Sequence, residues 1–329
     1  MGRNRKMAFA AAVVLCVTAG VLSLCLGAAR LSLKQLWQAI CEGPAGTAGY
    51  IFWYSRVPRT CACLLAGGAL ACAGCVLQSV LGNNLASPSV IGVNAGAGLA
   101  VTVCCALGAL SGWVVALAAF GGAMGAVVTV ALLGRKTGAS RTTVILAGVA
   151  MNAILNALRD AVTTLVPEAA MLSNEFRVGG FSTVAASRLV SAGALILLAL
   201  AVVLTLSNEL DVLALGEEMA QSLGMSVKRM RTVFLLLAAI LAGAAVSFAG
   251  LLGFVGLLVP HGARKLVGAE NRYLIPLSIL LGAGFVTACD LASRMLFVPY
   301  ELPVGIILSL IGGPFFLWLL LKRKGGRHG

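Results

Sequence analysis

Long apolar runs separated by short polar segments are the dominant pattern of this sequence. The clearest case lies at residues 56–99, where an Arg-containing segment leads into an apolar run over 60–81, then a polar turn at 82–84, then a second Gly-rich apolar run. About 20 helical residues cross the roughly 30 Å hydrocarbon core of a bilayer, and the loop between two such helices must lie in water or be satisfied by protein. The pattern therefore predicts a membrane-spanning helical hairpin.

The same pattern recurs along the whole chain and predicts ten membrane-spanning helices. We place them near residues 7–27, 60–81, 90–107, 113–133, 143–165, 189–207, 232–250, 251–266, 273–294 and 304–321. The eighth run is short, and we expect it to be partly irregular. Because the number of spans is even, both termini are predicted to lie on the same side of the membrane.

Composition supports an all-α polytopic membrane protein. Of 329 residues, 60% are hydrophobic and 11% charged, and the mean hydropathy is +1.01. A soluble domain usually carries about 25% charged residues. The 40 glycines let membrane helices approach each other closely. No linker is long enough to divide the chain, so residues 1–329 are predicted to form a single transmembrane domain.

The basic residues indicate the orientation. With a cytoplasmic N-terminus, 16 of the 24 basic residues fall on the inside: Arg3, Arg5, Lys6, Arg135, Lys136, Arg141, Lys228, Arg229, Arg231, Arg264, Lys265, Arg272, Lys322, Arg323, Lys324 and Arg327. This bias fits the positive-inside rule. The net charge of +13 therefore reflects membrane topology, and nucleic acid is not an expected partner. The apolar run after Arg3–Lys6 is longer than the roughly 7–15 residues of a signal peptide, which favours a retained first span.

Chemistry of catalysis or metal binding is not predicted. Nine of the ten cysteines lie in apolar runs, including the Cys72–Cys75 pair, and packing is the simpler interpretation than zinc ligation or disulfides. The two histidines fit no hydrolase or metalloprotease motif. No Gly is followed by Lys, so the GxxxxGK[ST] phosphate loop is absent. We expect no catalytic residue, no metal site and no cofactor in this chain; ATP would have to be bound by another subunit.

Residues 208–231 differ from the other polar segments. They contain Glu209, Asp211, Glu217 and Glu218 of the eleven acidic residues, interleaved with apolar side chains and followed by a basic cluster. Gly216 and Gly224 bracket a predicted helix of about two turns. Such a segment is either a solvated loop or an amphipathic knob that docks into the groove of a partner protein.

Five motifs together resemble the permease subunits of type II ABC importers, which take up ferric siderophores, haem and vitamin B12. They are RVPR at 56–59, the Gly-rich stretch 92–97, LALGEEMAQSLGM at 213–225, GFVGLLVPHGARKLVG at 253–268 and ELPVGIILSLIGGPFFLWLL at 301–320. The resemblance implies ten helices per subunit and a homodimer, occasionally a pseudo-heterodimer, around a central pathway. It further implies two cytoplasmic ATPase subunits that use ATP and Mg, an extracytoplasmic substrate-binding protein, a metal-chelate substrate, and a place in the lipid of the bacterial cytoplasmic (inner) membrane with both termini cytoplasmic.

The resemblance also implies roles for particular residues. The ATPase-coupling residues would be Leu215, Gly216, Glu217, Glu218, Met219, Leu223 and Gly224. The residues that dock the binding protein would be Arg56, Arg59 and Arg294. The alternatives are interfacial snorkelling for Arg56 and Arg59 and, for Arg294, an ion pair with Asp290 one turn earlier on the same helix.

The resemblance further implies a pathway along the fifth span, closed at the cytoplasmic end by the loop before it. Its candidate residues are Arg141, Thr142, Thr143, Asn152, Asn156, Arg159 and Arg177. The first three follow Ser140 in the loop that would close the cytoplasmic end, and Arg177 near the outer mouth would attract an anionic chelate. Polar residues within a membrane usually face a cavity or a partner, and hydrogen bonding between helices is the alternative.

Two other function classes remain open from the residues alone. An ion-coupled secondary transporter of a small solute usually needs a buried carboxylate or broken helices near the midplane. Asp160 and Asp290, the candidates, both lie near outer ends of spans. A membrane enzyme is the third interpretation and lacks a catalytic motif.

Overall fold

The computed structural model describes residues 2–27, 29, 31–136, 141–298 and 300–324, and every regular element in these ranges is helical. The elements are α1 (Arg3–Cys25), α2 (Leu33–Glu42), α3 (Gly46–Tyr50), the π-helix η1 (Ile51–Arg56), α4 (Val57–Leu81), α5 (Val93–Ala106), α6 (Gly112–Lys136), α7 (Arg141–Leu165), α8 (Pro167–Val178), α9 (Ala186–Thr205), α10 (Ser207–Ala214), α11 (Glu217–Ser222), α12 (Val227–Ala249), α13 (Val255–Val267), α14 (Asn271–Met295) and α15 (Val304–Lys324).

Each of the ten predicted runs coincides with a helix. Within the described residues, seven helices are long and apolar enough to cross a membrane, and Val93–Ala106 and Val304–Leu319 are shorter apolar helices. The eighth run is partly irregular as expected, because helix α13 begins only at Val255. Its 13 residues rise about 20 Å, short of the roughly 30 Å core. The third run is also shorter than predicted, since residues 90–92 belong to a turn.

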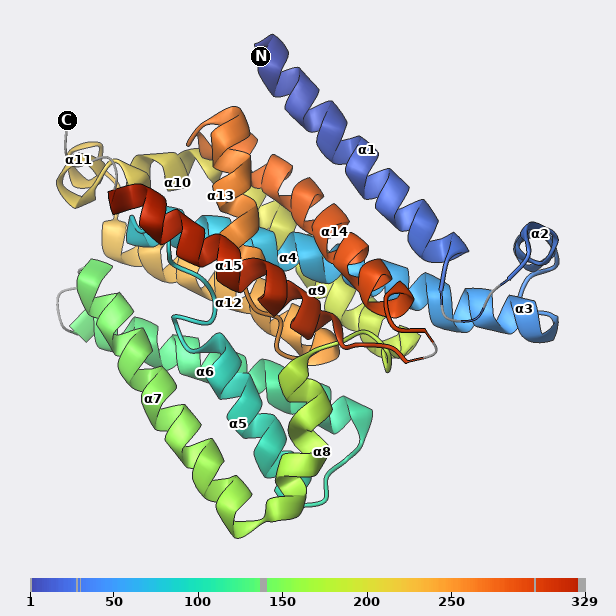
Figure 1. Cartoon of the computed structure of the whole chain (residues 1–329). Helices are drawn as coiled ribbons and strands as arrows, with labels where there is room; N and C mark the ends of the chain where they lie inside the picture. Colours follow the sequence, from blue (N-terminus) through green and yellow to red (C-terminus); the bar gives the residue numbers. More distant parts are fainter. Residues whose placement is uncertain (1, 28, 30, 137–140, 299, 325–329) are drawn as a thin grey trace.

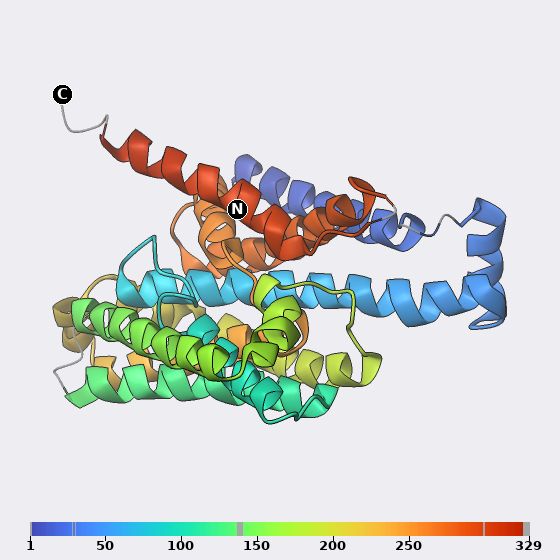
Figure 2. The same ribbon diagram turned by 60° about the horizontal axis from the view of Figure 1, so that its bottom comes forward.

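Helix α4 is the centre of the bundle, and 83% of its apolar window is buried. Figure 2 shows α4 between one group that contains α1, α13, α14 and α15 and a second group that contains α5, α6, α7 and α12. Two glycines of α4 allow close approach: a Cβ on Gly67 would overlap the carbonyl oxygen of Gly282 in α14, and a Cβ on Gly74 would overlap that of Gly256 in α13. Small residues thus set the helix spacing here.

Polar contacts define one end of the bundle, which we call the α11 end. Arg5 near the N-terminus donates to Glu270 at 3.1 Å, and the Asn271 backbone N–H donates to Asp211 of α10 at 2.9 Å. These contacts gather the start of α1, the start of α14 and helix α10 beside α11. Helices α2 and α3 lie at the opposite end, the α2 end (Figure 1).

Several short helices could not be found from apolar runs. Helix α2 begins with a capping box, in which Ser32 and Gln35 satisfy each other's backbone N–H groups, an arrangement that favours helix initiation. Helix α8 begins at Pro167, where the missing N–H is not needed. Their polar composition hides them from a hydropathy reading.

Candidate functional site

A groove opens where α5, α8, α15 and the break between α12 and α13 meet. It has a volume of about 520 Å³, and its polar lining comes from Asn94, Arg177 and Ser309, beside apolar residues such as Leu251 and Leu310. Arg177 is exposed, and its guanidinium donates to Asn174 at 3.2 Å. A groove with one cationic side chain and two neutral polar groups suits a polar or anionic ligand.

Backbone hydrogen bonds hold the segments around this groove together. The Leu251 N–H donates to the Phe176 carbonyl at 2.9 Å, the Gly180 N–H donates to Ala249 at 2.9 Å, and the Gly305 N–H donates to Gly179 at 3.2 Å. Irregular backbone within a membrane bundle is tolerated only where it is buried in protein or lines a cavity. The break between α12 and α13 meets both conditions.

Phe254, the last residue of the break, has a left-handed backbone. Its φ is +64°, and it is the only non-glycine residue with positive φ in the described ranges. The conformation is strained for a bulky side chain and persists where the surroundings enforce it, often at functional sites. The Phe254 ring lies against Gly312 of α15, where a Cβ would overlap it. The break and α15 are thereby locked together.

The residues predicted along the fifth span separate into different environments. The Asn152 side-chain amide donates to the carbonyls of Ser89 and Val90, both at 2.9 Å. Asn152 therefore ties α7 to the non-helical segment 82–92 and not to another helix, and Asn156 lies half-buried one turn further on. Arg159 pairs with its neighbour Asp160 at 2.9 Å.

The residues predicted in a loop before the fifth span instead form the first turn of α7. Arg141, Thr142 and Thr143 are helical, which corrects the predicted loop, and Ser140 lies outside the described residues. The Arg141 guanidinium donates to the Leu213 carbonyl at 2.9 Å and packs against Gly82. Arg141 thus links the start of α7 to the end of α10 and does not line the groove.

The predicted coupling residues lie on α11 and directly beside its two ends. Leu215, Met219 and Leu223 expose 65%, 57% and 62% of their surface, and Glu218 is exposed beside them. Gly216 and Gly224 bracket the helix with φ of +119° and +81°. Leu215 lies just before α11 and lines one open hollow with Met219, and Leu223 directly follows the helix. We call these three side chains the apolar stripe, and no element of the described chain covers it.

The two acidic residues of α11 differ in their surroundings. Glu217 pairs with the buried Arg231 of α12 at 3.4 Å, whereas Glu218 projects into the open hollow beside Met219 and Ser222. Glu217 consequently anchors α11 to the bundle. Glu218 is the acidic side chain left on the surface.

The three arginines predicted to dock a partner form part of a buried network at the α2 end. Arg56 is 4% exposed and Arg294 is 3% exposed. Arg56 donates to the carbonyls of Leu24 and Cys25 at the end of α1 and to the carbonyl of Ala29 beyond it. Such donors satisfy the carbonyls left free at a helix C-terminus.

This geometry corrects the prediction that Arg56 and Arg294 present charge to a partner, because their side chains lie inside the protein. Arg294 pairs with Asp290 at 3.1 Å and donates to Ser23 at 2.7 Å, so the ion pair on its own helix is the interpretation that the structure bears out. Arg59 contacts Asp290 at 3.0 Å and Glu301 at 2.7 Å. Only the Glu301 side of this network reaches the surface.

Sequence reasoning missed Asn94 and Ser309 as groove residues. Asn94 stands within the Gly-rich motif and Ser309 within the last motif, but a single polar residue in an apolar run has no spacing that marks it. Asn94 and Ser309 line the same groove as Arg177 together with residues of the break at 250–254, and this proximity is visible only in the fold.

Comparisons with known proteins agree with this architecture. The profile of the FecCD transport family matches residues 15–322. The chain is 35% identical to the iron-uptake system permease protein FeuB of Bacillus subtilis, with 94% of this chain and 93% of that protein covered. It is 33% identical to the hemin transport system permease protein HmuU of Yersinia pestis, with 96% of each covered.

A solved structure has the same fold. It is an inward-facing conformation described as a metal-chelate type ABC transporter, with a TM-score of 0.85, 28% identity, and 96% of this chain and 99% of that chain covered.

Proposed function

The chain belongs to the FecCD transport family, and from this premise we propose that it is the pathway-forming permease subunit of an ATP-driven importer for iron-siderophore-type metal chelates. Relatives named for iron uptake and hemin transport support this substrate class. The observation that carries the proposal is the pairing of an open groove that contains Arg177, Asn94 and Ser309 with the uncovered apolar stripe at α11. The groove fits a solute pathway, and the apolar stripe fits a docking site for a partner that supplies energy.

The groove is the proposed substrate pathway. Arg177 supplies a positive charge beside Asn94 and Ser309, which suits the carboxylate and hydroxamate oxygens by which chelates carry metal. A guanidinium binds such oxygens through charge-assisted hydrogen bonds. Of the residues that the sequence predicted to line the pathway, we therefore retain Arg177.

The apolar stripe of Leu215, Met219 and Leu223 is the proposed contact with a cytoplasmic ATPase subunit, which would bind the ATP and Mg. A short amphipathic helix docks by laying its apolar side into a partner's groove. From α11, the hydrogen bond between Arg141 and the Leu213 carbonyl leads to the start of α7. We propose that this contact carries the ATPase movement to α7.

A second copy of the chain is proposed to complete the pathway across α7. Only 11% of the apolar window of α7 is buried, against 83% for the span that contains α4. A helix with polar residues at helical spacing and so little cover within its own chain suits an interface around a polar pathway. We propose a homodimer of single-domain subunits in the bacterial cytoplasmic membrane, with both termini and α11 in the cytoplasm.

A substrate-binding protein is proposed to dock at the α2 end. Arg59 would reach an acidic residue of that protein only where Glu301 releases it, since Arg59 and Glu301 are 2.7 Å apart. Arg56 and Arg294 would act indirectly by fixing α1 and α14. An ion-coupled transporter is less well supported, because Asp290, the fully buried carboxylate, is already paired with two arginines.

The test is assembly and stimulation of the complete transporter. The chain would be produced with its cognate ATPase and purified, and ATP hydrolysis measured with and without the loaded binding protein. The loaded binding protein should raise hydrolysis. Met219→Lys should abolish co-purification of the ATPase, because a charge enters the apolar stripe. The matched control is Met171→Lys on α8, which is 81% exposed and lies far from α11.

Two outcomes would contradict the proposal. One is full ATPase co-purification with the Met219→Lys chain. The other is hydrolysis in the assembled wild-type complex that does not respond to the loaded binding protein.

A further inference from the structure

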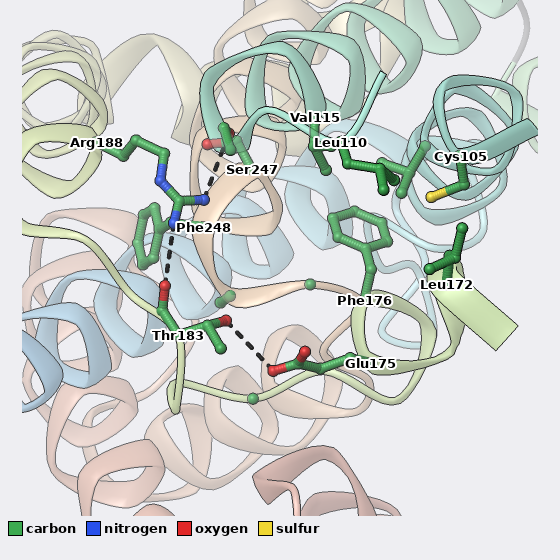
Figure 3. A pocket seen from close by; sticks show the side chains of 15 residues that line it. Cys105, Leu110, Val115, Leu172, Glu175, Phe176, Thr183, Arg188, Ser247 and Phe248 are labelled. Atoms are coloured by element: carbon green, nitrogen blue, oxygen red, sulfur yellow. Dashed lines mark hydrogen bonds between the residues drawn. The ribbon is translucent and has the colours of Figure 1, made fainter. Parts of the chain in front are cut away.

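A separate pocket of about 250 Å³ lies toward the α2 end, between the α5–α6 connection, α8, the start of α9 and the end of α12. Figure 3 shows it from close by. It has no lining residue in common with the proposed pathway groove. Its inner wall is apolar, with Val101, Val115 and Phe248, whereas Arg188 and Glu175 supply opposite charges.

Thr183 fixes both charged side chains. Arg188 donates from Nη2 to the Thr183 carbonyl at 3.0 Å and from Nη1 to the Gly112 carbonyl at 3.4 Å. Glu175 accepts from the hydroxyls of Ser182 and Thr183 at 3.1 and 3.3 Å. Within the described residues Arg188 and Glu175 form no ion pair with each other, and Figure 3 shows Thr183 between them. The pocket thus presents one cationic and one anionic side chain, each held in place by hydrogen bonds and neither paired with an opposite charge in the described residues.

An apolar groove of about 200 Å³ adjoins this pocket. It lies between the first turns of α6 and α9 and the end of α12, with Trp113, Leu117, Phe120 and Leu195 among its lining residues. Arg188 and Ser247 line both spaces. From Trp113 to Phe120 the groove follows α6 for about two turns, or roughly 10 Å. Exposed Trp113 at the outer edge is typical of the level where lipid headgroups begin.

We propose that this pocket and groove together bind one zwitterionic aminophospholipid, with an ethanolamine headgroup, from the leaflet at the α2 end. Its phosphate contacts Arg188, its ammonium group contacts Glu175, and the first part of an acyl chain occupies the groove.

Charge complementarity selects this lipid among common ones. An anionic phosphatidylglycerol headgroup would pair with Arg188 and leave Glu175 without a cation. A choline headgroup carries no N–H, so it cannot donate to the Glu175 carboxylate. Ethanolamine carries three N–H donors and one positive charge, and it matches both side chains.

The test is lipid retention by the full-length chain, measured by native mass spectrometry after incubation with equal amounts of phosphatidylethanolamine, phosphatidylglycerol and phosphatidylcholine of identical acyl chains. The wild-type protein should retain the ethanolamine lipid preferentially. Arg188→Ala should reduce that retention about tenfold, since a charge-assisted hydrogen bond contributes roughly this factor. Lys34→Ala, at an exposed basic residue of α2, is the control and should retain the wild-type level.

Two further pairs of variants test recognition of the headgroup and binding of the acyl chain separately. Glu175→Gln should remove the preference for ethanolamine over choline, while Glu168→Gln, at an exposed position of the same helix, should preserve it. Ala192→Phe fills the groove and should lower retention of all three lipids, whereas Ala194→Phe, exposed on the same helix α9, should not.

Unchanged ethanolamine-lipid retention in Arg188→Ala and Ala192→Phe would overturn the proposal, as would equal retention of the three lipids by the wild type. If Arg188→Ala fails to fold, the Glu175 and Ala192 comparisons decide the question with their own controls.

Discussion

Asp290 holds the polar network at the α2 end together, and its neutralisation is the most direct test of that network. The Asp290 side chain is fully buried, and it accepts from Arg59 Nε and Nη2 at 3.0–3.2 Å and pairs with Arg294 at 3.1 Å. The change Asp290→Asn keeps the shape and removes the charge. Arg59 then keeps Glu301 as its carboxylate partner, and the buried guanidinium of Arg294 loses the charge of the carboxylate that it pairs with.

The expected loss of stability follows from burial. Breaking a buried ion pair by removing one partner costs about 3–5 kcal/mol, because the remaining charge is left without compensation. Asp160→Asn is the matched control: it removes a carboxylate from the Arg159 pair, but the Asp160 side chain is 67% exposed. Exposed pairs contribute about 0–1 kcal/mol. The two variants should therefore differ by at least about 2 kcal/mol.

The measurement is equilibrium unfolding of the purified chain in mixed micelles as the denaturing detergent fraction is raised, followed by helicity. Arg294→Gln and the double variant with Asp290→Asn complete a mutant cycle, and the double variant should lose at least about 1 kcal/mol less than the sum of the single changes. If Asp290→Asn unfolds within about 0.5 kcal/mol of Asp160→Asn, the network does not stabilise the fold and the reasoning is refuted.

The remaining predictions concern helix packing and transmission. Gly74→Ala should lower the free energy of unfolding by about 1–3 kcal/mol, because its Cβ would overlap the Gly256 carbonyl. The control is Gly121→Ala, which has no heavy atom within 4 Å of the added Cβ and should be neutral or stabilising by up to about 1 kcal/mol. Equal effects of the two changes in the unfolding assay would contradict the packing argument. Arg141→Ala should leave ATPase assembly and basal hydrolysis intact but reduce substrate uptake into proteoliposomes, because the bond to the Leu213 carbonyl is lost; unchanged uptake would exclude that contact as a route of transmission.

Hydropathy was sufficient to find the membrane helices because each long helix is a nearly continuous apolar run. The short break before Val255 could also be anticipated from the length of its run. Helices α2 and α8 could not, because they are polar and their starts depend on Ser32 with Gln35 and on Pro167. Local capping signals of this kind are weak without a surrounding apolar pattern.

Charged residues were harder to interpret than apolar ones. The short helix between Gly216 and Gly224 could be predicted, since two glycines around a mixed apolar and acidic segment are a local pattern; its docking role stays a prediction. The burial of Arg56 and Arg294 could not be predicted, because burial depends on partners distant in sequence. Arg294 contacts Ser23, and Arg59 contacts Glu301. A sequence shows that a charge exists but not which segment folds over it.

The close backbone contacts between α4 and helices α13 and α14 limit how these helices can move relative to one another. At the contacts of Gly67 with Gly282 and of Gly74 with Gly256, no side chain separates α4 from α14 and α13, so sliding at these two points would bring backbone atoms into collision. These three helices are therefore expected to travel as one rigid block. Any opening of the bundle must then occur where this block meets the other helices. Segment 82–92, which is hydrogen-bonded to Asn152, is the connection best placed to act as a hinge.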